Sequence, residues 1–379
     1  MTPERIFEDK VRTDTSFAKH LDDIFDFYDR SAKPEFKLVR DTINNWFKDY
    51  PDSEKIELKA RFKKTFSPAF FELFIYQLFT KQGFSLTPHP ALIGTTKKPD
   101  FLAEKEGISF YIEAKEATDA SEIEIASSKK VNTVYDAISQ IETPNFWLNV
   151  SKVALKTSKQ PSGKRIIRSI EKQLITYDLE TIEAQMRLPE WSDTEHIIID
   201  NDEVFISIKL FPKSEEIRGD RGIPSIGMYP IESFWGGPDN SIRTSIHKKA
   251  SKYGQLDKPY LICINAFSNG GITTFGVEEA LLGSLSYTWS SNPNDRDARL
   301  ERVKNGVFLS QTGPKMTRVS GIFVTSVFPS NVHNAAHWLM KHPYAKRELD
   351  FDKMDLSYQH LVGRHWQNML GKTVGEILE

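Results

Sequence analysis

One stretch of the sequence, residues 67–118, constrains the fold most, because a helical pattern is followed there by strand patterns that carry acidic residues. Ser67 and Pro68 are typical of a helix start, and Gly83 is typical of a helix end. The residues between them are apolar on nearly every side: Phe70, Phe71, Leu73, Phe74, Ile75, Leu78 and Phe79. This pattern predicts a helix that is buried all round.

Glu72 is the acidic residue within this apolar helix. Its neighbours three and four positions away include Ala69, Ile75 and Tyr76, so its carboxylate lies on an apolar side. A buried carboxylate is costly unless another group pairs with it. We expect that partner to be a metal ion or the lysine of a nearby site.

Two strand patterns follow the helix. Residues 108–115 alternate apolar with polar side chains, which predicts a strand with Glu113 and Lys115 on the same side. Asp100 ends a Pro99-Asp100 step just before an apolar pair. Two carboxylates and a lysine at neighbouring strand ends could hold a divalent metal ion and a water molecule, which is the chemistry of phosphodiester cleavage.

A helix-borne Glu, then Pro-Asp, then Glu-x-Lys on a strand resembles the PD-(D/E)xK nuclease superfamily, which has the restriction-endonuclease-like fold. The resemblance implies that Asp100 and Glu113 bind Mg²⁺, which Mn²⁺ can replace, with the carbonyl of Ala114 contributing. Lys115 would orient or help to deprotonate the attacking water, and Glu72 would bind or tune the metal site. It also implies a bacterial nuclease that cuts nucleic acid, with DNA as the favoured substrate and restriction or anti-phage defence as the setting.

A second Pro-Asp and Glu-x-Lys combination occurs at Asp52 and Glu57, but only four residues separate these two acids. That is too short for two strands and a turn, and the charge spacing there predicts a solvated helix. Asp100 and Glu113 are separated by twelve residues, which is enough for a hairpin with Gly107 in its turn. An edge hairpin with surface charges remains the alternative interpretation of this motif.

The length and composition limit the other possibilities. A chain of 379 residues predicts two domains, or one domain with a large insertion. The net charge is −2, so any positive surface for nucleic acid must be local. The single cysteine, Cys263, excludes an intrachain disulfide and is expected to be a small buried residue. No apolar signal segment or membrane-spanning stretch is present in the sequence, so we expect a cytoplasmic protein.

The predicted architecture is α/β: a mixed sheet flanked by helices, as in the restriction-endonuclease-like core. Residues 1–66 are predicted to be a helical extension, residues 67–118 the first part of the core, and residues 331–379 a helical segment. The helix and strand that complete the core are either those of residues 131–155 or those of residues 241–267. We favour the second pair, which makes residues 119–240 an inserted α/β subdomain and residues 241–330 the second part of the core.

The most basic patch lies between residues 152 and 172, where Glu171 is the one acid. Its basic residues are Lys152, Lys156, Lys159, Lys164, Arg165, Arg168 and Lys172. We expect Lys164, Arg165 and Arg168 to contact the phosphates of the substrate, and a solvated basic helix is the alternative.

Lys249 and Tyr253 lie one turn apart in a second basic helix. The run from Lys249 to Gly254 also looks like a motif of bacterial proteins with this nuclease layout. Both side chains could approach the metal site, and Lys249 is a further candidate for substrate binding. A surface lysine is the alternative interpretation.

Three histidines near the C-terminus form a weaker pattern. His333 and His337 are four residues apart on a predicted helix, and His342 follows. This spacing can bind zinc, but no Glu follows His333 and no third ligand is evident, so we expect ordinary core or surface histidines.

The sequence has no phosphate-binding loop, no dinucleotide glycine fingerprint and no nucleophile elbow. The alternatives to a nuclease are a module of the same fold that binds nucleic acid or a partner without cutting, and a hydrolase of small phosphoesters. A homodimer or a partner protein of a defence system is compatible with any of them.

Overall fold

The computed structural model describes residues 2–118, 122–188, 190–191, 194–220, 223, 225–228, 238–267, 271–288, 299–363 and 365–379. The chain divides into two compact units, each of which is considered separately. The core unit comprises Met1–Ser16, Ile24–Asp119 and Phe234–Glu379. The inserted unit comprises Phe17–Asp23 and Ala120–Ser233.

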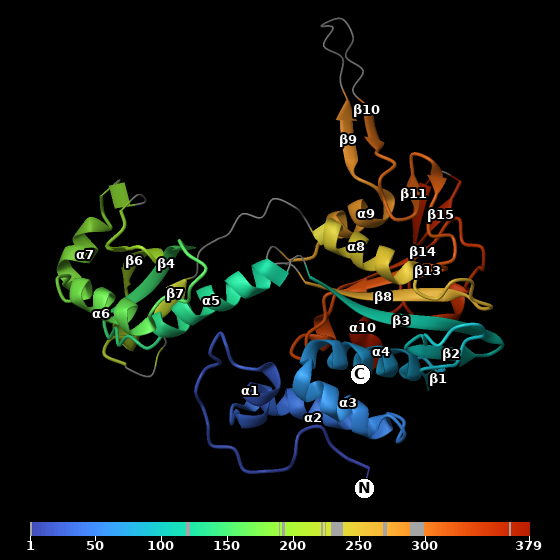
Figure 1. Cartoon of the computed structure of the whole chain (residues 1–379), viewed down its shortest axis with the longest axis horizontal. Coiled ribbons are helices and arrows are strands. Elements are labelled where there is room, and N and C mark those ends of the chain that lie inside the picture. Colours follow the sequence, from blue (N-terminus) through green and yellow to red (C-terminus); the bar gives the residue numbers. More distant parts are fainter. Residues whose placement is uncertain are drawn as a thin grey trace, which may run out of the picture. The chain divides into compact units, whose positions relative to one another are not determined.

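An eight-stranded mixed sheet forms the centre of the core unit, in the order β1-β2-β3-β8-β13-β14-β15-β16 (Figure 1). Its strands are β1 (Ser85–Pro88), β2 (Phe101–Lys105), β3 (Ile108–Thr118), β8 (Tyr260–Phe267), β13 (Gly321–Thr325), β14 (His337–Lys341), β15 (Tyr358–Val362) and β16 (His365–Met369). Strand β8 is parallel to both β3 and β13, and β14 is parallel to β15, whereas the other neighbours are antiparallel. Two short ribbons, β9 (Leu285–Thr288) with β10 (Arg299–Arg302) and β11 (Leu309–Ser310) with β12 (Gly313–Pro314), lie outside this sheet.

Helices cover both faces of the core sheet (Figure 1). On one face lie α2 (Pro34–Asp49), α3 (Lys55–Lys64) and α4 (Phe66–Lys81), preceded by α1 (Ile24–Arg30), and α10 (Val374–Leu378) contacts α4. On the other face lie α8 (Pro238–Ala250) and α9 (Thr274–Leu282). Each layer has its own apolar cluster, so β3 and β8 are covered on both sides.

Helix α4 is buried on nearly all sides, as its continuous apolar pattern predicts. It begins at Phe66, one residue before the predicted start, and it ends at Lys81. Gly83 follows with a φ of +85°, a conformation that glycine adopts without steric cost. The chain then turns directly into β1.

The β2–β3 hairpin positions the two candidate metal-binding carboxylates. Phe101 pairs with Ile112, and the same register continued by one residue places Asp100 opposite Glu113. The turn contains Glu106 and Gly107, with φ values of +46° and +83°. A tight turn with two left-handed residues fixes this register.

The helix and strand that complete the sheet beside β3 are α8 and β8. Glu113 pairs with Ile262 of β8, and the pairing runs parallel over eight residues from Tyr111 to Thr118. The other candidate strand, β4, belongs to a separate sheet.

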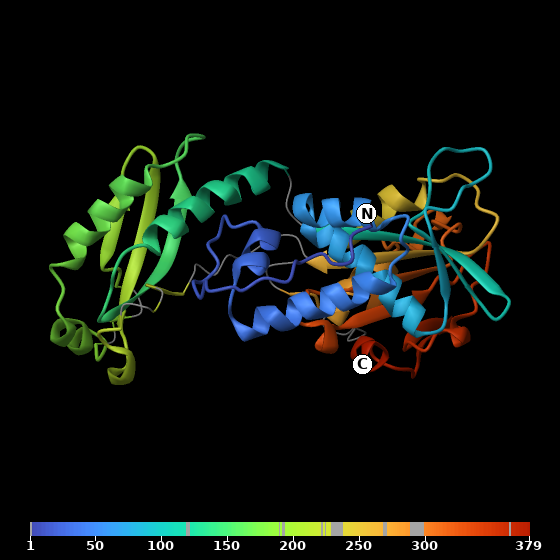
Figure 2. The same ribbon diagram turned by 90° about the horizontal axis from the view of Figure 1, so that it is seen from below.

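The inserted unit has a four-stranded sheet in the order β5-β6-β4-β7. Its elements are α5 (Glu122–Ile138), β4 (Phe146–Leu155), α6 (Gly163–Leu174), α7 (Leu179–Gln185), β5 (Ile197–Asp200), β6 (Val204–Pro212), the 3₁₀ turn η2 (Glu215–Ile217) and β7 (Ile226–Met228). The helices pack on this sheet through one apolar cluster, with α5 and α6 side by side (Figure 2).

The prediction of a helical C-terminal segment is wrong. His333 lies in a 3₁₀ turn, η3 (Val332–Asn334), and His337 begins β14. After a second 3₁₀ turn, η4 (Phe351–Lys353), the chain forms β15 and β16, and only α10 at its end is helical. A spacing of four residues between histidines is equally compatible with a turn followed by a strand, because tertiary pairing with β13 decides the backbone conformation here.

Within residues 1–66, which are predicted to be a helical extension, the first described helix begins at Ile24. The N–H groups of His20 and Leu21 donate to the carboxylate of Asp136, with distances of 2.7 and 3.2 Å. Side-chain acceptors compete here with helical hydrogen bonds, and Phe17 and Leu21 remain about half exposed.

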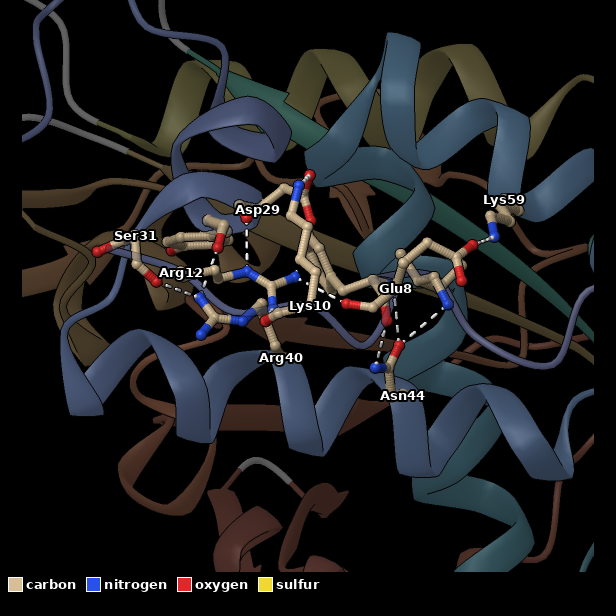
Figure 3. Close-up of polar contacts among 11 residues, drawn as sticks. Glu8, Lys10, Arg12, Asp29, Ser31, Arg40, Asn44 and Lys59 are labelled. Atoms are coloured by element: carbon tan, nitrogen blue, oxygen red, sulfur yellow. Dashed lines mark hydrogen bonds and ion pairs between the residues drawn. The ribbon is translucent and has the colours of Figure 1, made fainter. Parts of the chain in front are cut away.

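The N-terminal residues are fixed to the core unit by a polar network (Figure 3). The amide oxygen of Asn44 accepts the N–H groups of Ile6 and Phe7, each at 3.0 Å. Arg12 contacts Asp29, and the buried guanidinium of Arg40 donates to the carbonyl of Ser31. These bonds hold an extended segment without regular secondary structure against α2.

Candidate active site

Two carboxylates from adjacent strands form the centre of the candidate site. Glu113 of β3 is fully buried, and Asp100 precedes β2 on the neighbouring strand. One carboxylate oxygen of Asp100, Oδ2, accepts the backbone N–H of Ala114 at 2.6 Å. The hairpin register therefore brings together the two acids that the sequence analysis selected.

The charge of Asp100 is not balanced by a basic partner. Across the described ranges of the chain, its carboxylate makes no ion pair, and Ala114 is its one hydrogen-bond donor. Burial and the negative charge of Glu113 raise the pKa of Asp100 to about 7, although the Ala114 hydrogen bond acts in the opposite direction. Two neighbouring carboxylates in such surroundings favour the binding of a cation.

Glu113 is held by three side chains from the end of α8 and the turn after it. Lys249 and Lys252 both contact Oε1, the latter at 2.9 Å. The hydroxyl of Tyr253 donates to Oε2, and it also lies 2.7 Å from the carbonyl of Lys98. Burial and the charge of Glu113 raise the pKa of Tyr253, so its hydroxyl remains a donor at neutral pH.

Lys115, the lysine of the Glu-x-Lys motif, is exposed. Among the residues that the structure describes, its side chain makes no ion pair or hydrogen bond. It lies two positions after Glu113 on the same strand, and therefore on the same face of the sheet. The lysines in contact with Glu113 are instead Lys249 and Lys252.

The expected partner of Glu72 was a metal ion or the lysine of the site, and this expectation is wrong. The hydroxyl of Tyr50 donates to Oε1 of Glu72 at 2.9 Å, and Arg61 forms an ion pair with Oε2 at 2.7 Å. Neither Tyr50 nor Arg61 stands out in the sequence, because Arg61 lies among the other basic residues of α3. Glu72 nevertheless contributes to the electrostatics of the site, since its charge helps to raise the pKa of Asp100.

These contacts test whether the site suits a divalent cation. The described part of the chain contains no group of three or more His, Cys, Asp or Glu side chains that could hold a metal ion. With Glu72 engaged elsewhere, Asp100 and Glu113 remain as candidates, although both oxygens of Glu113 are themselves contacted by side chains of the α8 end. Mg²⁺ commonly binds through one or two carboxylates, several waters and the phosphates of a substrate, so this pair fits it. Ala114 contacts Asp100 through its N–H.

The remaining candidates lie elsewhere. Lys164, Arg165 and Arg168 belong to α6 of the inserted unit. Cys263 is buried, as predicted, and burial raises the pKa of its thiol, so it is a poor nucleophile.

Among the helices that the structure describes, none is both long and apolar enough to cross a membrane. A comparison of this chain with protein-family models, with curated proteins and with solved structures found no match.

Proposed function

We propose that this protein is a metal-dependent nuclease that hydrolyses phosphodiester bonds in nucleic acid. The observation that carries this proposal is the pair of carboxylates, Asp100 and Glu113, which the register of the β2–β3 hairpin places opposite each other, so that burial and the charge of Glu113 raise the pKa of Asp100 to about 7. Glu113 is compensated by Lys249 and Lys252, whereas Asp100 makes no ion pair with a described residue, and a bound cation would compensate its charge. The Pro-Asp and Glu-x-Lys pattern favours the same chemistry.

Asp100 and Glu113 would hold Mg²⁺, or Mn²⁺ in its place. When bound, such an ion supplies a Lewis acid for the phosphoryl oxygen and lowers the pKa of a coordinated water. The protein fixes the orientation of Glu113 through Tyr253 and Lys249. The N–H of Ala114 fixes Asp100 in the same way.

The lysines supply positive charge where the substrate would carry negative charge. Lys249 and Lys252 contribute two ammonium groups beside two carboxylates, so the site as a whole is close to neutral. Lys115 is exposed on the same face and is free to orient a water or to contact a phosphate oxygen. Glu72 and Arg61 form a neutral pair that tunes Asp100 from the α4 side.

DNA is the favoured substrate, and restriction or anti-phage defence is the favoured setting, on the basis of the sequence resemblance. The second candidate function is a module of this fold that binds nucleic acid or a partner without cutting. The observation that favours it is that Glu113 forms ion pairs with two lysines, which neutralise its carboxylate without any metal ion.

A plasmid-nicking assay with Mg²⁺ or with EDTA tests the proposal. We expect nicking by the parent protein with Mg²⁺, and a loss of about 10³-fold in Asp100→Asn, because the substitution removes one of two anionic ligands. Asp52→Asn is the matched control, since Asp52 also follows a proline but lies exposed and pairs only with Lys55. Cleavage by Asp100→Asn at the parent rate would contradict the assignment. The absence of cleavage by the parent with Mg²⁺ and with Mn²⁺, together with retained DNA binding, would favour the binding module.

A further inference from the structure

Helix α6 of the inserted unit has two sides of opposite character. Ile166 and Ile170 are buried in the apolar cluster beneath it. The opposite side carries four exposed basic residues: Lys164, Arg165, Arg168 and Lys172. We call this side the basic α6 face.

The charges of the basic α6 face are only partly neutralised, since Glu171, three residues after Arg168, is the one acid of this helix. In the described part of the chain, the side chains of Lys164, Arg168 and Lys172 make no ion pair or hydrogen bond. Arg165 has one distant contact, 3.8 Å from Glu203, and its side chain is 64% exposed. The whole chain has a net charge of −2, so this concentration of positive charge is local. Unpaired cations on a helix repel one another, and an anionic ligand would relieve that repulsion.

A shallow hollow of about 470 Å³ lies along the same side of the helix. Its lining is Ser162, Lys164, Arg165, Arg168, Ser169 and Lys172. None of these is acidic or apolar, and two of them bear hydroxyl groups. The first turn of α6 contains no acidic residue, and the Ser162 side chain makes no capping hydrogen bond, so the helix start adds to the positive potential.

The dimensions of the basic α6 face match a nucleic-acid backbone. With a rise of about 1.5 Å per residue, Lys164 and Lys172 are separated by roughly 12 Å along the helix axis. Double-stranded DNA carries one phosphate charge per about 1.7 Å of its axis, so this length faces about seven charges on the two strands. Arginine forks and hydroxyl groups suit phosphate oxygens, whereas a membrane-binding helix would also present apolar side chains to the lipid.

We propose that the basic α6 face binds the phosphate backbone of double-stranded nucleic acid, independently of base sequence. This inference rests on the proposed function, because it describes how the inserted unit would hold the substrate of that site. It assigns Lys172, Ser162 and Ser169 to the surface together with Lys164, Arg165 and Arg168.

The test measures how tightly the whole chain binds a 30-base-pair DNA duplex. Fluorescence anisotropy monitors binding at several salt concentrations, with EDTA present to prevent metal-dependent cleavage. The triple variant K164E/R168E/K172E should lose at least ~30-fold in affinity, and its dependence on salt should weaken by about three ions. The matched control is K64E/K81E/K304E, which changes three exposed lysines of the core unit and alters the net charge equally. The control should stay within about threefold of the parent, since non-local charge contributes little at physiological salt. The milder double variant R168Q/K172Q should lose roughly tenfold in affinity for the duplex. It keeps the test valid if the triple variant does not fold.

Three outcomes would overturn the inference. These are equal affinity of the parent and both basic-face variants, an equal loss in the control, or tighter binding by the parent to phosphatidylserine vesicles than to the duplex.

Turnover of bis(p-nitrophenyl) phosphate separates this inference from the proposed function. If the triple variant loses DNA affinity while the parent shows no turnover in any metal, the proposed function fails and the basic α6 face stands. If the parent turns over this small diester but the triple variant binds DNA normally, the inference fails and the proposed function stands.

Discussion

The candidate active site and the basic α6 face both concentrate charge, but they neutralise it differently. In the core unit, Glu113 contacts Lys249 and Lys252, and Glu72 contacts Arg61, so the buried charges have partners within the fold. On α6, Lys164 and Arg168 face water without partners in the described structure. Asp100 lies between these extremes, because it is partly buried but makes no ion pair with a described residue.

This difference separates charges that stabilise the protein from charges that are available to a ligand. Removal of one member of a buried pair leaves the other charge uncompensated, and that costs stability. Removal of an exposed cation costs almost nothing, since water already solvates it. Substitutions in the two regions should therefore have opposite effects on folding and on binding.

The largest expected effect is on catalysis by Glu113→Gln. This substitution keeps the side-chain shape but removes the anionic ligand, so Mg²⁺-dependent cleavage should fall about 10³-fold. Arg168→Gln, on the basic α6 face, should leave the turnover of a small phosphodiester unchanged. Steady-state kinetics with bis(p-nitrophenyl) phosphate measure both. Equal losses in the two variants would remove the distinction between the regions.

Arg61→Met should lower the free energy of unfolding by about 3 kcal/mol, because it leaves Glu72 buried without its ion-pair partner. Glu72→Gln in the same chain should recover part of that loss. Urea denaturation of the two single variants and the double variant forms a double-mutant cycle. Additive effects would show that Glu72 does not depend on Arg61.

Lys249→Met should cost about 2 kcal/mol, since it removes one of two ammonium groups from the fully buried Glu113. Lys115→Met and Arg168→Met should each change stability by less than about 0.5 kcal/mol, as both side chains are exposed. Thermal denaturation of the three variants compares them directly. A loss of stability in Lys115→Met as large as that in Lys249→Met would place Lys115 among the paired charges.

His342 provides a smaller, pH-dependent effect in the core unit. Burial lowers its pKa to about 4, from an ordinary value near 6.5, so the folded state keeps the ring neutral. Below pH 6.5 the unfolded state takes up a proton that the folded state does not, so stability falls as the pH falls from 6.5 towards 4. His342 should lower the free energy of unfolding by about 2 kcal/mol between pH 7 and pH 5. His342→Asn should remove this part of the pH dependence. Urea denaturation at the two pH values measures it, and an identical pH dependence in the variant would contradict the assignment.

Local patterns predicted the elements whose sequence determines them directly. Strand β4 lies within residues 131–155, where a helix and a strand are predicted. Gly83, the predicted helix end, has a left-handed conformation just after α4. Asp100 and Glu113 were brought together by a hairpin whose length was visible in the sequence. These predictions depend on neighbours within about a dozen residues.

Distant contacts were predicted only in part: the approach of Lys249 and Tyr253 to the site was expected and is confirmed, whereas other distant contacts were missed. The partner of Glu72 comes from α3, and its identity follows from how two helices pack rather than from spacing. Lys252 approaches Glu113 across 139 positions of the sequence. The C-terminal strands were missed because pairing with β13 and β14, not local periodicity, orders them.

The hairpin turn at Glu106 and Gly107 has a consequence for how the sequence can vary. Successive strand residues point to opposite faces, so the loss of one residue from β3 between the turn and Glu113 would point that carboxylate at α4. The loss of two would shorten the strand and keep the carboxylate towards α8. In functional relatives of this chain, the number of β3 residues between the turn and Glu113 should therefore differ only by even numbers. This holds although these residues take no part in the chemistry.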